Sequence, residues 1–346
     1  MPPTAAAHDA SATAMDATCT AEARPLASVL LIAYNQQATI AAAVAGALAQ
    51  TYSPLEIIVS DDASSDGTFA AMASAVAGYT GLHRVIVNRN PCNLGIGAHL
   101  SKLVSLSHGE LLFIAAGDDV SLPQRCERVV AAWLASGKRL DLIASALEDM
   151  DEHGHVHQRI TPSDLANYRN AADWLAQPPF VVGAAQAWTR RVFDRFGPLP
   201  PGVVAEDLLM VFRAIVSGGA LTLPEPLVRY RRGGVSARRR AMSAQEVVAG
   251  LLKNNRSSLV ELPQLLADAR VAGQLPSVEA ALSARLARER FIRDMFAAQR
   301  LGDRLSLAAR ARKVPLSLRL RVLAYAGFPS LLAPWFAVKR QLAHKS

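Results

Sequence analysis

Residues 28–35 read SVLLIAYN, and residues 56–68 read EIIVSDDASSDGT. Each stretch begins as an apolar, β-branched run, stops at polar residues and is followed by a helical pattern. This repeat predicts two β-α units that feed one parallel sheet. Because ligands bind off the carboxyl ends of such strands, we expect Asn35, Asp61 and Asp62 to share one crevice. Two adjacent carboxylates there suit the polar edge of a nucleoside or a metal ion.

The alternation of strands and helices continues to about residue 146. The predicted strands cover residues 27–33, 55–60, 84–88, 110–115 and 140–146. Four helices are predicted between these strands. The first follows the first strand and ends near residue 50, and the second begins near Ser65-Asp66. The third covers 97–107, and the fourth starts at Ser121 and Pro123 and runs to about 135. A hairpin at 147–160 and helices at 163–176 and 206–217 follow. After about residue 240 the pattern is helical, with weak breaks near Pro263, Gly273-Pro276 and Gly302.

The composition favours a globular protein with a large core. The chain has 346 residues, of which 51% are hydrophobic, which is enough for one large domain with an appendage or for two domains. Three cysteines, Cys19, Cys92 and Cys126, are odd in number and far apart, which favours a reducing, cytoplasmic compartment without a disulfide framework.

The net charge of +8 is concentrated in residues 229–240 and 285–345. It indicates either solvated helix faces or attraction to a pyrophosphate or an anionic lipid. We expect no nucleic-acid partner, because no nucleic-acid-binding motif accompanies the charge.

The two ends of the chain differ from the middle. Residues 1–24 are rich in Ala, Thr and Ser and lack the basic start and apolar core of a secretory signal, so we expect a disordered tail. We expect a domain at 25–240 and a helical C-terminal region at 241–346. Its segment from Leu316 to Arg340 is too short and too broken by prolines to span a bilayer. It is expected either to lie against the inner face of the cell membrane or to pack on the domain as core.

The chain resembles the family 2 nucleotide-sugar glycosyltransferases of the GT-A fold over roughly residues 25–235. The resemblance is carried by an ordered set of motifs: Ser28 to Asn35, Gln50-Thr51-Tyr52, Glu56 to Thr68, Asn93-Leu94-Gly95, His108-Gly109-Glu110, Gly117-Asp118-Asp119 and Glu206-Asp207. It implies an α/β fold with a mixed, mainly parallel sheet flanked by helices, followed here by the helical C-terminal region.

The resemblance also implies a site for a nucleoside diphosphate sugar. The residues that it assigns to this site are Ala33, Tyr34, Asn35, Asp61, Asp62, Asn93, Gly95, Gly117, Asp118, Arg229 and Arg232. Asp61 and Asp62 would contact the base or ribose, although capping of the next helix also explains them. Arg229 and Arg232 would lie near the diphosphate, or at a solvated basic strand end. Leu100 and Ser101 replace the Arg-Asn that relatives often have in the following helix.

A divalent cation, Mg²⁺ or Mn²⁺, is implied at Asp118 and Asp119, because the departing diphosphate develops negative charge. Ala116 replaces the first acid of the family's Asp-x-Asp-Asp pattern and leaves Asp118 as the main expected ligand; the alternative is a turn capped by Asp119. A second candidate metal site is the alternating set His153, His155 and His157. These are expected instead on an exposed hairpin, since no Cys or carboxylate with zinc-site spacing is nearby.

The acidic pair Glu206-Asp207 is implied as the catalytic site, with Asp207 as the base that deprotonates the acceptor. The alternative is that both acids complement a helix dipole. The expected reaction is inverting transfer of a single sugar to a hydroxyl of a cell-surface glycan or a lipid-linked precursor. The Gln-x-x-Arg-Trp element of processive relatives is absent from the sequence. Two other functions stay open: a non-catalytic nucleotide-sugar-binding module, suggested by Ala116, and a membrane-peripheral scaffold.

Overall fold

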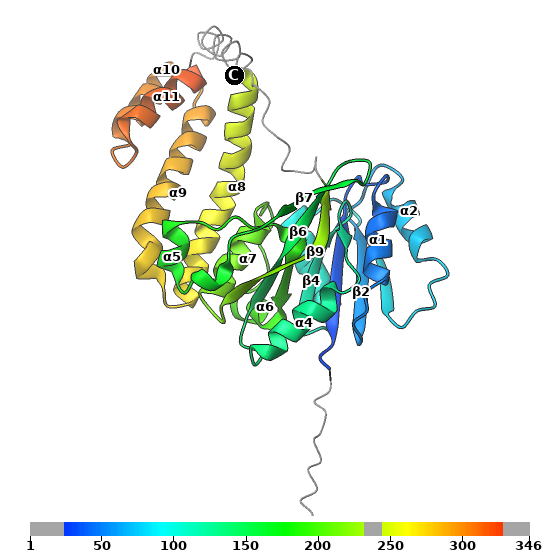
Figure 1. The fold of residues 1–346 in the computed structure, drawn as a ribbon. Helices are drawn as coiled ribbons and strands as arrows, with labels where there is room; N and C mark the ends of the chain where they lie inside the picture. Colours follow the sequence, from blue (N-terminus) through cyan, green and yellow to red (C-terminus); the bar gives the residue numbers. More distant parts are fainter. Residues whose placement is uncertain (1–23, 232–243, 328–346) are drawn as a thin grey trace, which may run out of the picture.

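The computed structural model describes residues 24–231 and 244–327, which form one mixed sheet covered by helices (Figure 1). The strands in these residues are β1 (Ala27–Ala33), β2 (Leu55–Asp61), β3 (Arg84–Arg89), β4 (Leu111–Ala116), β5 (Val120–Ser121), β6 (Leu142–Met150), β7 (Val156–Ile160), β8 (Gln186–Thr189) and β9 (Ala220–Arg231). The helices are α1 (Ile40–Leu48), α2 (Thr68–Val76), α3 (Ile96–Leu106), α4 (Arg125–Ala135), α5 (Ala171–Ala176), α6 (Arg190–Phe196), α7 (Glu206–Ile215), α8 (Ala244–Val271), α9 (Leu275–Ala297), α10 (Leu301–Arg310) and α11 (Leu316–Gly327).

The sheet has the strand order β3-β2-β1-β4-β8-β6-β9-β5, with β7 beside β6. β1 pairs in parallel with β2 and β4, β2 pairs in parallel with β3, and β6 with β9. The shorter pairings of β8 with β4 and β6 are antiparallel. The predicted fold class, a mixed and mainly parallel sheet flanked by helices with a helical C-terminal region, is confirmed.

Alternate residues of the central strands feed two cores, one on each face of the sheet. Leu31, Val59 and Phe113 pack with α1 and α4 on one face. Leu30 and Ile58 face the other way and pack with α3, α6 and α7. This alternation follows from the two-residue period of a strand and explains why both strand motifs are apolar throughout.

Helices α8 and α9 belong to the second of these cores. Leu262 and Leu265 of α8 and Leu282 of α9 are buried in the same cluster as α7. The other ends of α8 and α9 project beyond the sheet and meet α10 and α11 (Figure 1), around a separate small core that contains Met295 and Leu318. The C-terminal helices therefore take part in building the face of the domain that α7 occupies. In residues 24–231 and 244–327, no helix is both long and apolar enough to cross a bilayer.

Three local predictions were wrong. The helix predicted at 163–176 is a short 3₁₀ turn at Leu165–Asn167 followed by α5, which is capped by the side chain of Asn170. Pro263 does not break α8, because the helix is held by the packing of its neighbours Leu262 and Leu265 and tolerates one missing hydrogen bond. Ser121 lies in β5, and α4 begins after Pro123, at Arg125.

Candidate functional site

The carboxyl ends of β1 and β4 and the start of α3 enclose a cavity of about 330 Å³, here called the strand-end cavity. It is lined by Ile32, Ala33, Tyr34, Gln36, Asp62, Asn93, Gly95, Ile96, His99, Ala116 and Asp118. Six of the residues predicted for the nucleotide-sugar site are among them: Ala33, Tyr34, Asp62, Asn93, Gly95 and Asp118. The parallel register of β1 with β2 and β4 brings these distant segments to one edge of the sheet.

Asp62 anchors the loop that forms one wall of this cavity. Its carboxylate is 3% exposed and accepts hydrogen bonds from Asn90 Nδ2 at 2.7 Å, Leu94 N at 3.0 Å and Gly95 N at 3.0 Å. Gly95 has a φ of +75°, which favours glycine, and it immediately precedes α3. The buried carboxylate thus fixes the loop from Asn90 to Gly95 against the end of β2.

His99 lies behind Asp62 and was not predicted as a site residue. Its ring is 2% exposed, with Nε2 2.6 Å from Ser60 Oγ and Nδ1 3.9 Å from Asp62 Oδ2. Burial lowers the pKa of His99 to about 4, so the imidazole is neutral at pH 7. A neutral ring that faces the cavity offers a polar, uncharged wall to a ligand.

Asn35 and Asp61 hold the loops in place and do not line the cavity. Asn35 N donates to Ser64 Oγ at 2.9 Å, and Asn35 Oδ1 accepts from Ser65 N at 2.9 Å. Asp61 is fully buried, accepts from Ser64 N and pairs with Arg89 Nε at 3.2 Å. The predicted roles of these two residues in nucleotide binding stay predictions, and their observed contacts are with the chain itself.

The run Gly117-Asp118-Asp119 follows β4. A Cβ on Gly117 would lie 2.5 Å from Gln36 Oε1 and 2.9 Å from Ala33 Cβ, and the second of these contacts favours glycine because the Ala33 side chain cannot rotate away. Asp118 lines the cavity, whereas Asp119 is 5% exposed and its Oδ1 accepts from the backbone N of Arg231 at 2.8 Å. Burial raises the pKa of both carboxyls, that of Asp119 to about 8 with a further contribution from the charge of Asp118.

Arg231 connects this run to the neighbouring hairpin, and sequence reasoning missed it. Its Nε donates to Asp118 O at 3.1 Å, and its Nη1 donates to Asp151 O and Glu152 O at 3.0 and 2.8 Å. Of the two predicted arginines, Arg229 lies in β9 and pairs with Glu148 at 3.0 Å, outside the strand-end cavity. Arg232 lies outside the described residues.

The alternating histidines lie on the exposed hairpin, as predicted, with His153 and His155 in the turn and His157 in β7. However, a carboxylate is nearby, contrary to expectation: Asp151 Oδ2 lies 2.9 Å from His157 Nε2 and 3.4 Å from His155 Nδ1. These contacts lower the pKa of Asp151. In the part of the chain that the structure describes, no three His, Cys, Asp or Glu side chains gather closely enough to hold a metal ion by themselves.

A second cavity of about 410 Å³, here called the α7 cavity, lies at the start of α7. It is lined by Ile96, Val204, Ala205, Glu206, Asp207, Asn254, Ser257, Ser258 and Glu261. Ile96 lines both cavities, so the two adjoin at this residue. The predicted catalytic pair is therefore next to the strand-end cavity, although about ninety residues separate Asp118 from Asp207 in the sequence.

Three acids meet in the α7 cavity. Withdrawal from solvent, together with the charges of Asp207 and Glu261, raises the pKa of Glu206 to about 8. Withdrawal from solvent and Glu261 also raise the pKa of Asp207. Glu261 reaches across from α8, and its Oε1 accepts from Val204 N at 3.1 Å and Ala205 N at 2.9 Å. It thereby satisfies backbone N–H groups at the start of α7.

The α8 side of this cavity was missed, but the sequence holds a signal for it. Asn254, Ser257, Ser258 and Glu261 recur at intervals of three and four residues, which places them on one face of a helix. A polar stripe of this kind in a helix that otherwise packs against the core indicates a face in contact with water, and here that face lines the α7 cavity.

The residues that line the strand-end cavity fit a divalent cation only in part. Asp118 is a hard oxygen ligand, and its mutual repulsion with Asp119 is a cost that a bound dication would relieve. A cation would need further ligands from phosphate oxygens and water.

Residues 28–197, about half of the chain, match glycosyl transferase family 2. The domain belongs to this family. It is 32% identical over 139 residues to Bacillus subtilis EpsE, which is named as a candidate glycosyltransferase; the match covers 40% of this chain and 49% of EpsE. It is 24% identical over 233 residues to the Rhizobium meliloti succinoglycan biosynthesis protein ExoO, covering 61% of this chain and 63% of ExoO. The chain thus spans about half to two thirds of the length of these curated relatives.

The glycosyl transferase family 2 domain also has the fold of known structures. S. aureus TarS, solved in complex with UDP-GlcNAc, superposes with a TM-score of 0.52 at 15% sequence identity, covering 90% of this chain and 92% of that one. At this identity the likeness shows a shared fold, which agrees with the GT-A fold expected from the sequence.

Proposed function

We propose that this protein is an inverting glycosyltransferase that moves one sugar from a nucleoside diphosphate sugar to a hydroxyl of an acceptor. The observation that carries the proposal is the junction of the two cavities at Ile96. One cavity offers the polar groups and the carboxylate of a nucleotide site, and the other offers a carboxylate pair suited to proton transfer. Membership of glycosyl transferase family 2 and the UDP-GlcNAc complex of a protein with the same fold support this reading.

In the proposed reaction the donor occupies the strand-end cavity and the acceptor hydroxyl lies beside Asp207. Asp207 takes the proton of the hydroxyl while its oxygen attacks the anomeric carbon from the face opposite the diphosphate. The bond between the anomeric carbon and the diphosphate oxygen breaks, and the nucleoside diphosphate departs with both electrons. The high pKa of Glu206 keeps that side chain protonated near neutral pH, so Asp207 is the member of the pair that is free to act as base.

A divalent cation held by Asp118 would neutralise the charge that develops on the departing diphosphate. Asp119 would hold the chain segment that carries Asp118 in place, since its Oδ1 accepts a hydrogen bond from the backbone N of Arg231. Gln36 interacts with the Asp118 side chain and holds its carboxylate at the cavity.

Replacement of Asp118 by Asn should weaken nucleoside diphosphate binding chiefly when Mg²⁺ or Mn²⁺ is present. A neutral amide is a poorer ligand for a hard dication, whereas the shape of the side chain is unchanged. Calorimetric titration of wild type and variant, each with the cation and with EDTA, measures the effect. Equal affinities of the two proteins in the presence of the cation would show that Asp118 is not a ligand of the cation.

Replacement of Glu261 by Gln should shift the acidic limb of the profile of kcat/KM against pH to lower pH. Glu261 raises the pKa of Asp207, so loss of its charge lets the base ionise in more acidic solution. Gln retains the oxygen that accepts from Val204 N and Ala205 N, so the start of α7 should stay in place. Glu279→Gln, at an exposed position of α9, is the matched control and should leave the profile unchanged. An unchanged limb in Glu261→Gln would show that this carboxylate does not tune the base.

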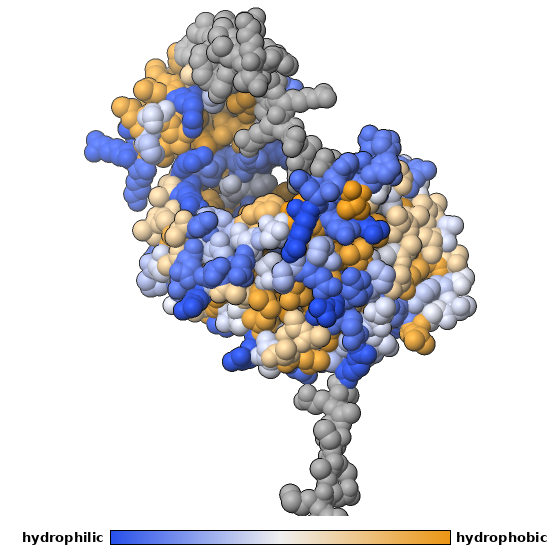
Figure 2. Space-filling model, in the orientation of Figure 1, coloured by the Kyte–Doolittle hydropathy of each residue, from blue (hydrophilic) through white to orange (hydrophobic). Residues whose placement is uncertain are grey.

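The acceptor that we propose is a cell-surface glycan or a lipid-linked precursor, and the named role of ExoO in succinoglycan biosynthesis supports this class. We also propose peripheral contact with the inner face of the cell membrane through the C-terminal helices. Leu301, Leu305, Leu316 and Leu320 are 45–61% exposed on α10 and α11. Figure 2 shows orange apolar surface with blue polar side chains around it over these helices.

Co-sedimentation with anionic liposomes tests the membrane contact. The basic residues of α10, α11 and their connections, Arg300, Arg304, Arg310, Arg312, Lys313, Arg319 and Arg321, should attract anionic headgroups. Binding should therefore be strong at low salt and lost at high salt. A protein that stays in the supernatant at low salt would contradict the contact. The predicted segment Leu316 to Arg340 extends beyond the described residues after Gly327.

A further inference from the structure

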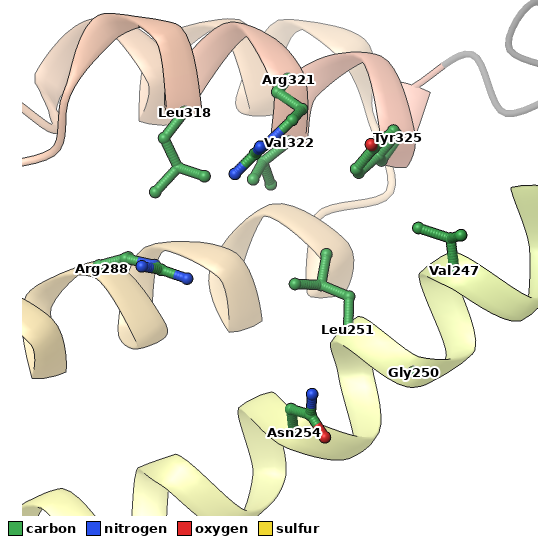
Figure 3. A pocket seen from close by; sticks show the side chains of 9 residues that line it. All are labelled: Val247, Gly250, Leu251, Asn254, Arg288, Leu318, Arg321, Val322 and Tyr325. Carbon is green, nitrogen blue, oxygen red and sulfur yellow. The ribbon is translucent and has the colours of Figure 1, made fainter. Parts of the chain in front are cut away.

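A third cavity, here called the arginine cavity, lies between α8, α9 and α11 and has a volume of about 410 Å³ (Figure 3). It is lined by Val247, Gly250, Leu251, Asn254, Arg288, Leu318, Arg321, Val322 and Tyr325. Its size is within the range of small-molecule sites, and its lining is largely apolar with a few polar groups.

The polar groups of this cavity favour an anion. Figure 3 shows the side chains of Arg288 and Arg321 reaching from α9 and α11 into the space between those helices. Arg288 lies 3.4 Å from Glu289, whose other oxygen accepts from Asn255 Nδ2 at 2.7 Å. Within the described residues, Arg321 has no carboxylate partner and no Asp or Glu lines the cavity. Guanidinium groups of this kind suit phosphate oxygens.

The apolar groups favour a hydrocarbon chain beside that anion. Leu251 on α8 faces Leu318 and Val322 on α11 across the cavity in Figure 3. Gly250 adds open space, since no heavy atom of the described residues lies within 4 Å of the position that a Cβ would take. The lining therefore suits an amphiphile with a phosphate group.

The arginine cavity adjoins the α7 cavity, because Asn254 lines both. Along α8, Leu251 faces the first and Ser258 faces the second. These residues are about 10 Å apart at 1.5 Å per residue. One extended ligand that occupies both cavities would therefore run along this stretch of α8.

We propose that the arginine cavity binds the lipid-phosphate part of the acceptor and thereby presents the acceptor sugar to the α7 cavity. This inference rests on the proposed function and specifies its acceptor as a glycan carried on a phosphorylated apolar chain. Arg321 and Arg288 bind the phosphate, Leu251, Leu318 and Val322 contact the chain, and Asn254 lies at the passage between the two cavities.

The test is direct binding of farnesyl phosphate to the full-length protein, measured by calorimetry with the strand-end cavity saturated by UDP and Mg²⁺. Farnesol and inorganic phosphate each supply one half of the ligand and should bind much more weakly. Arg321→Gln should weaken farnesyl phosphate binding by roughly tenfold to a hundredfold, because a hydrogen bond between charged groups is lost. Arg290→Gln removes the same charge from an exposed position of α9 outside the cavity and should leave binding unchanged.

A second variant blocks the apolar part of the arginine cavity and leaves both arginines in place. Gly250→Leu places a side chain in the open space and should abolish binding, whereas Gly250→Ala should bind nearly as wild type does. Both changes favour the helical conformation of α8, so neither should lower the thermal stability. A lower melting temperature of Gly250→Leu would show that the cavity is filled by the chain's own core, and would overturn the proposal.

Three other results would also overturn it: no binding of farnesyl phosphate by the wild type, equal affinity of wild type and Arg321→Gln, or equally tight binding of short-chain phosphatidylglycerol, which would make the cavity a site for ordinary membrane lipid. The proposed function has a separate readout in the binding of UDP with Mg²⁺. If UDP binds and farnesyl phosphate does not, the acceptor inference alone fails. If neither UDP nor any other nucleoside diphosphate binds, the proposed glycosyltransferase function fails.

Discussion

Replacement of Asp207 by Asn is expected to slow sugar transfer by about 10²- to 10⁴-fold and to leave nucleotide binding unchanged. The amide cannot take the proton of the acceptor hydroxyl, but its oxygen can still accept from Leu208 N, as Asp207 Oδ1 does at 2.8 Å. The start of α7 should therefore keep its shape. Single-turnover kinetics with bound donor separate the chemical step from binding.

The matched control for this variant is Glu206→Gln, which removes the neighbouring carboxyl and leaves the proposed base. Because Glu206 is protonated near neutral pH, its replacement by the neutral amide should slow sugar transfer much less than Asp207→Asn does. If Asp207→Asn transfers sugar at a near-wild-type rate and Glu206→Gln transfers it much more slowly, then Glu206 and not Asp207 is the base.

Replacement of Asp268 by Ala is expected to destabilise the protein by about 3–5 kcal/mol, because it leaves a buried arginine without its partner. Asp268 Oδ2 lies 2.8 Å from Arg213 Nε, and the two side chains are 1% and 0% exposed. The pair joins α7 to α8 and so fixes the helix that carries Glu261 beside the helix that carries Asp207. Unfolding in urea measures the change.

A surface pair of similar chemistry is the control. Asp294 pairs with Arg293 at 2.9 Å on the exposed side of α9, and Asp294→Ala should cost about 1 kcal/mol or less. The double variant Arg213→Met/Asp268→Leu should recover most of the stability, since apolar side chains of similar volume need no charged partner. A loss in Asp268→Ala no larger than that in Asp294→Ala would show that the buried pair does not hold α8 in place.

The central sheet could be predicted because its strands are continuous apolar runs that end at polar residues. β1 has the predicted bounds, Ala27–Ala33, and β2 ends one residue beyond the prediction, at Asp61. The structure of residues 163–176 was harder to predict, because the break in the helix at Tyr168 depends on capping by Asn170, which local periodicity does not encode. The continuity of α8 through Pro263 depends on packing with α7 and α9, which is tertiary information.

Within the candidate site, the sequence indicated the acidic pairs but not which member of each pair faces the cavity. Consecutive residues of an extended chain point to opposite sides, so Asp62 lines the strand-end cavity while Asp61 pairs with Arg89 behind it. Asp118 and Asp119 divide in the same way, with Asp119 held by the backbone of Arg231. The choice depends on the exact end of the strand, which sequence patterns fix only to within a few residues.

The most direct test of the account is a thermal-shift titration with nucleoside diphosphates in the presence of Mn²⁺. A nucleotide that binds the folded state at a hundred times its Kd adds about 2.7 kcal/mol of stability. For a folded unit of this size we therefore predict a rise in melting temperature of roughly 4 °C with the preferred nucleotide, and a much smaller rise in Asp118→Asn. If no nucleoside diphosphate raises the melting temperature of the wild type, the strand-end cavity is not a nucleotide-sugar site and the proposed function is contradicted.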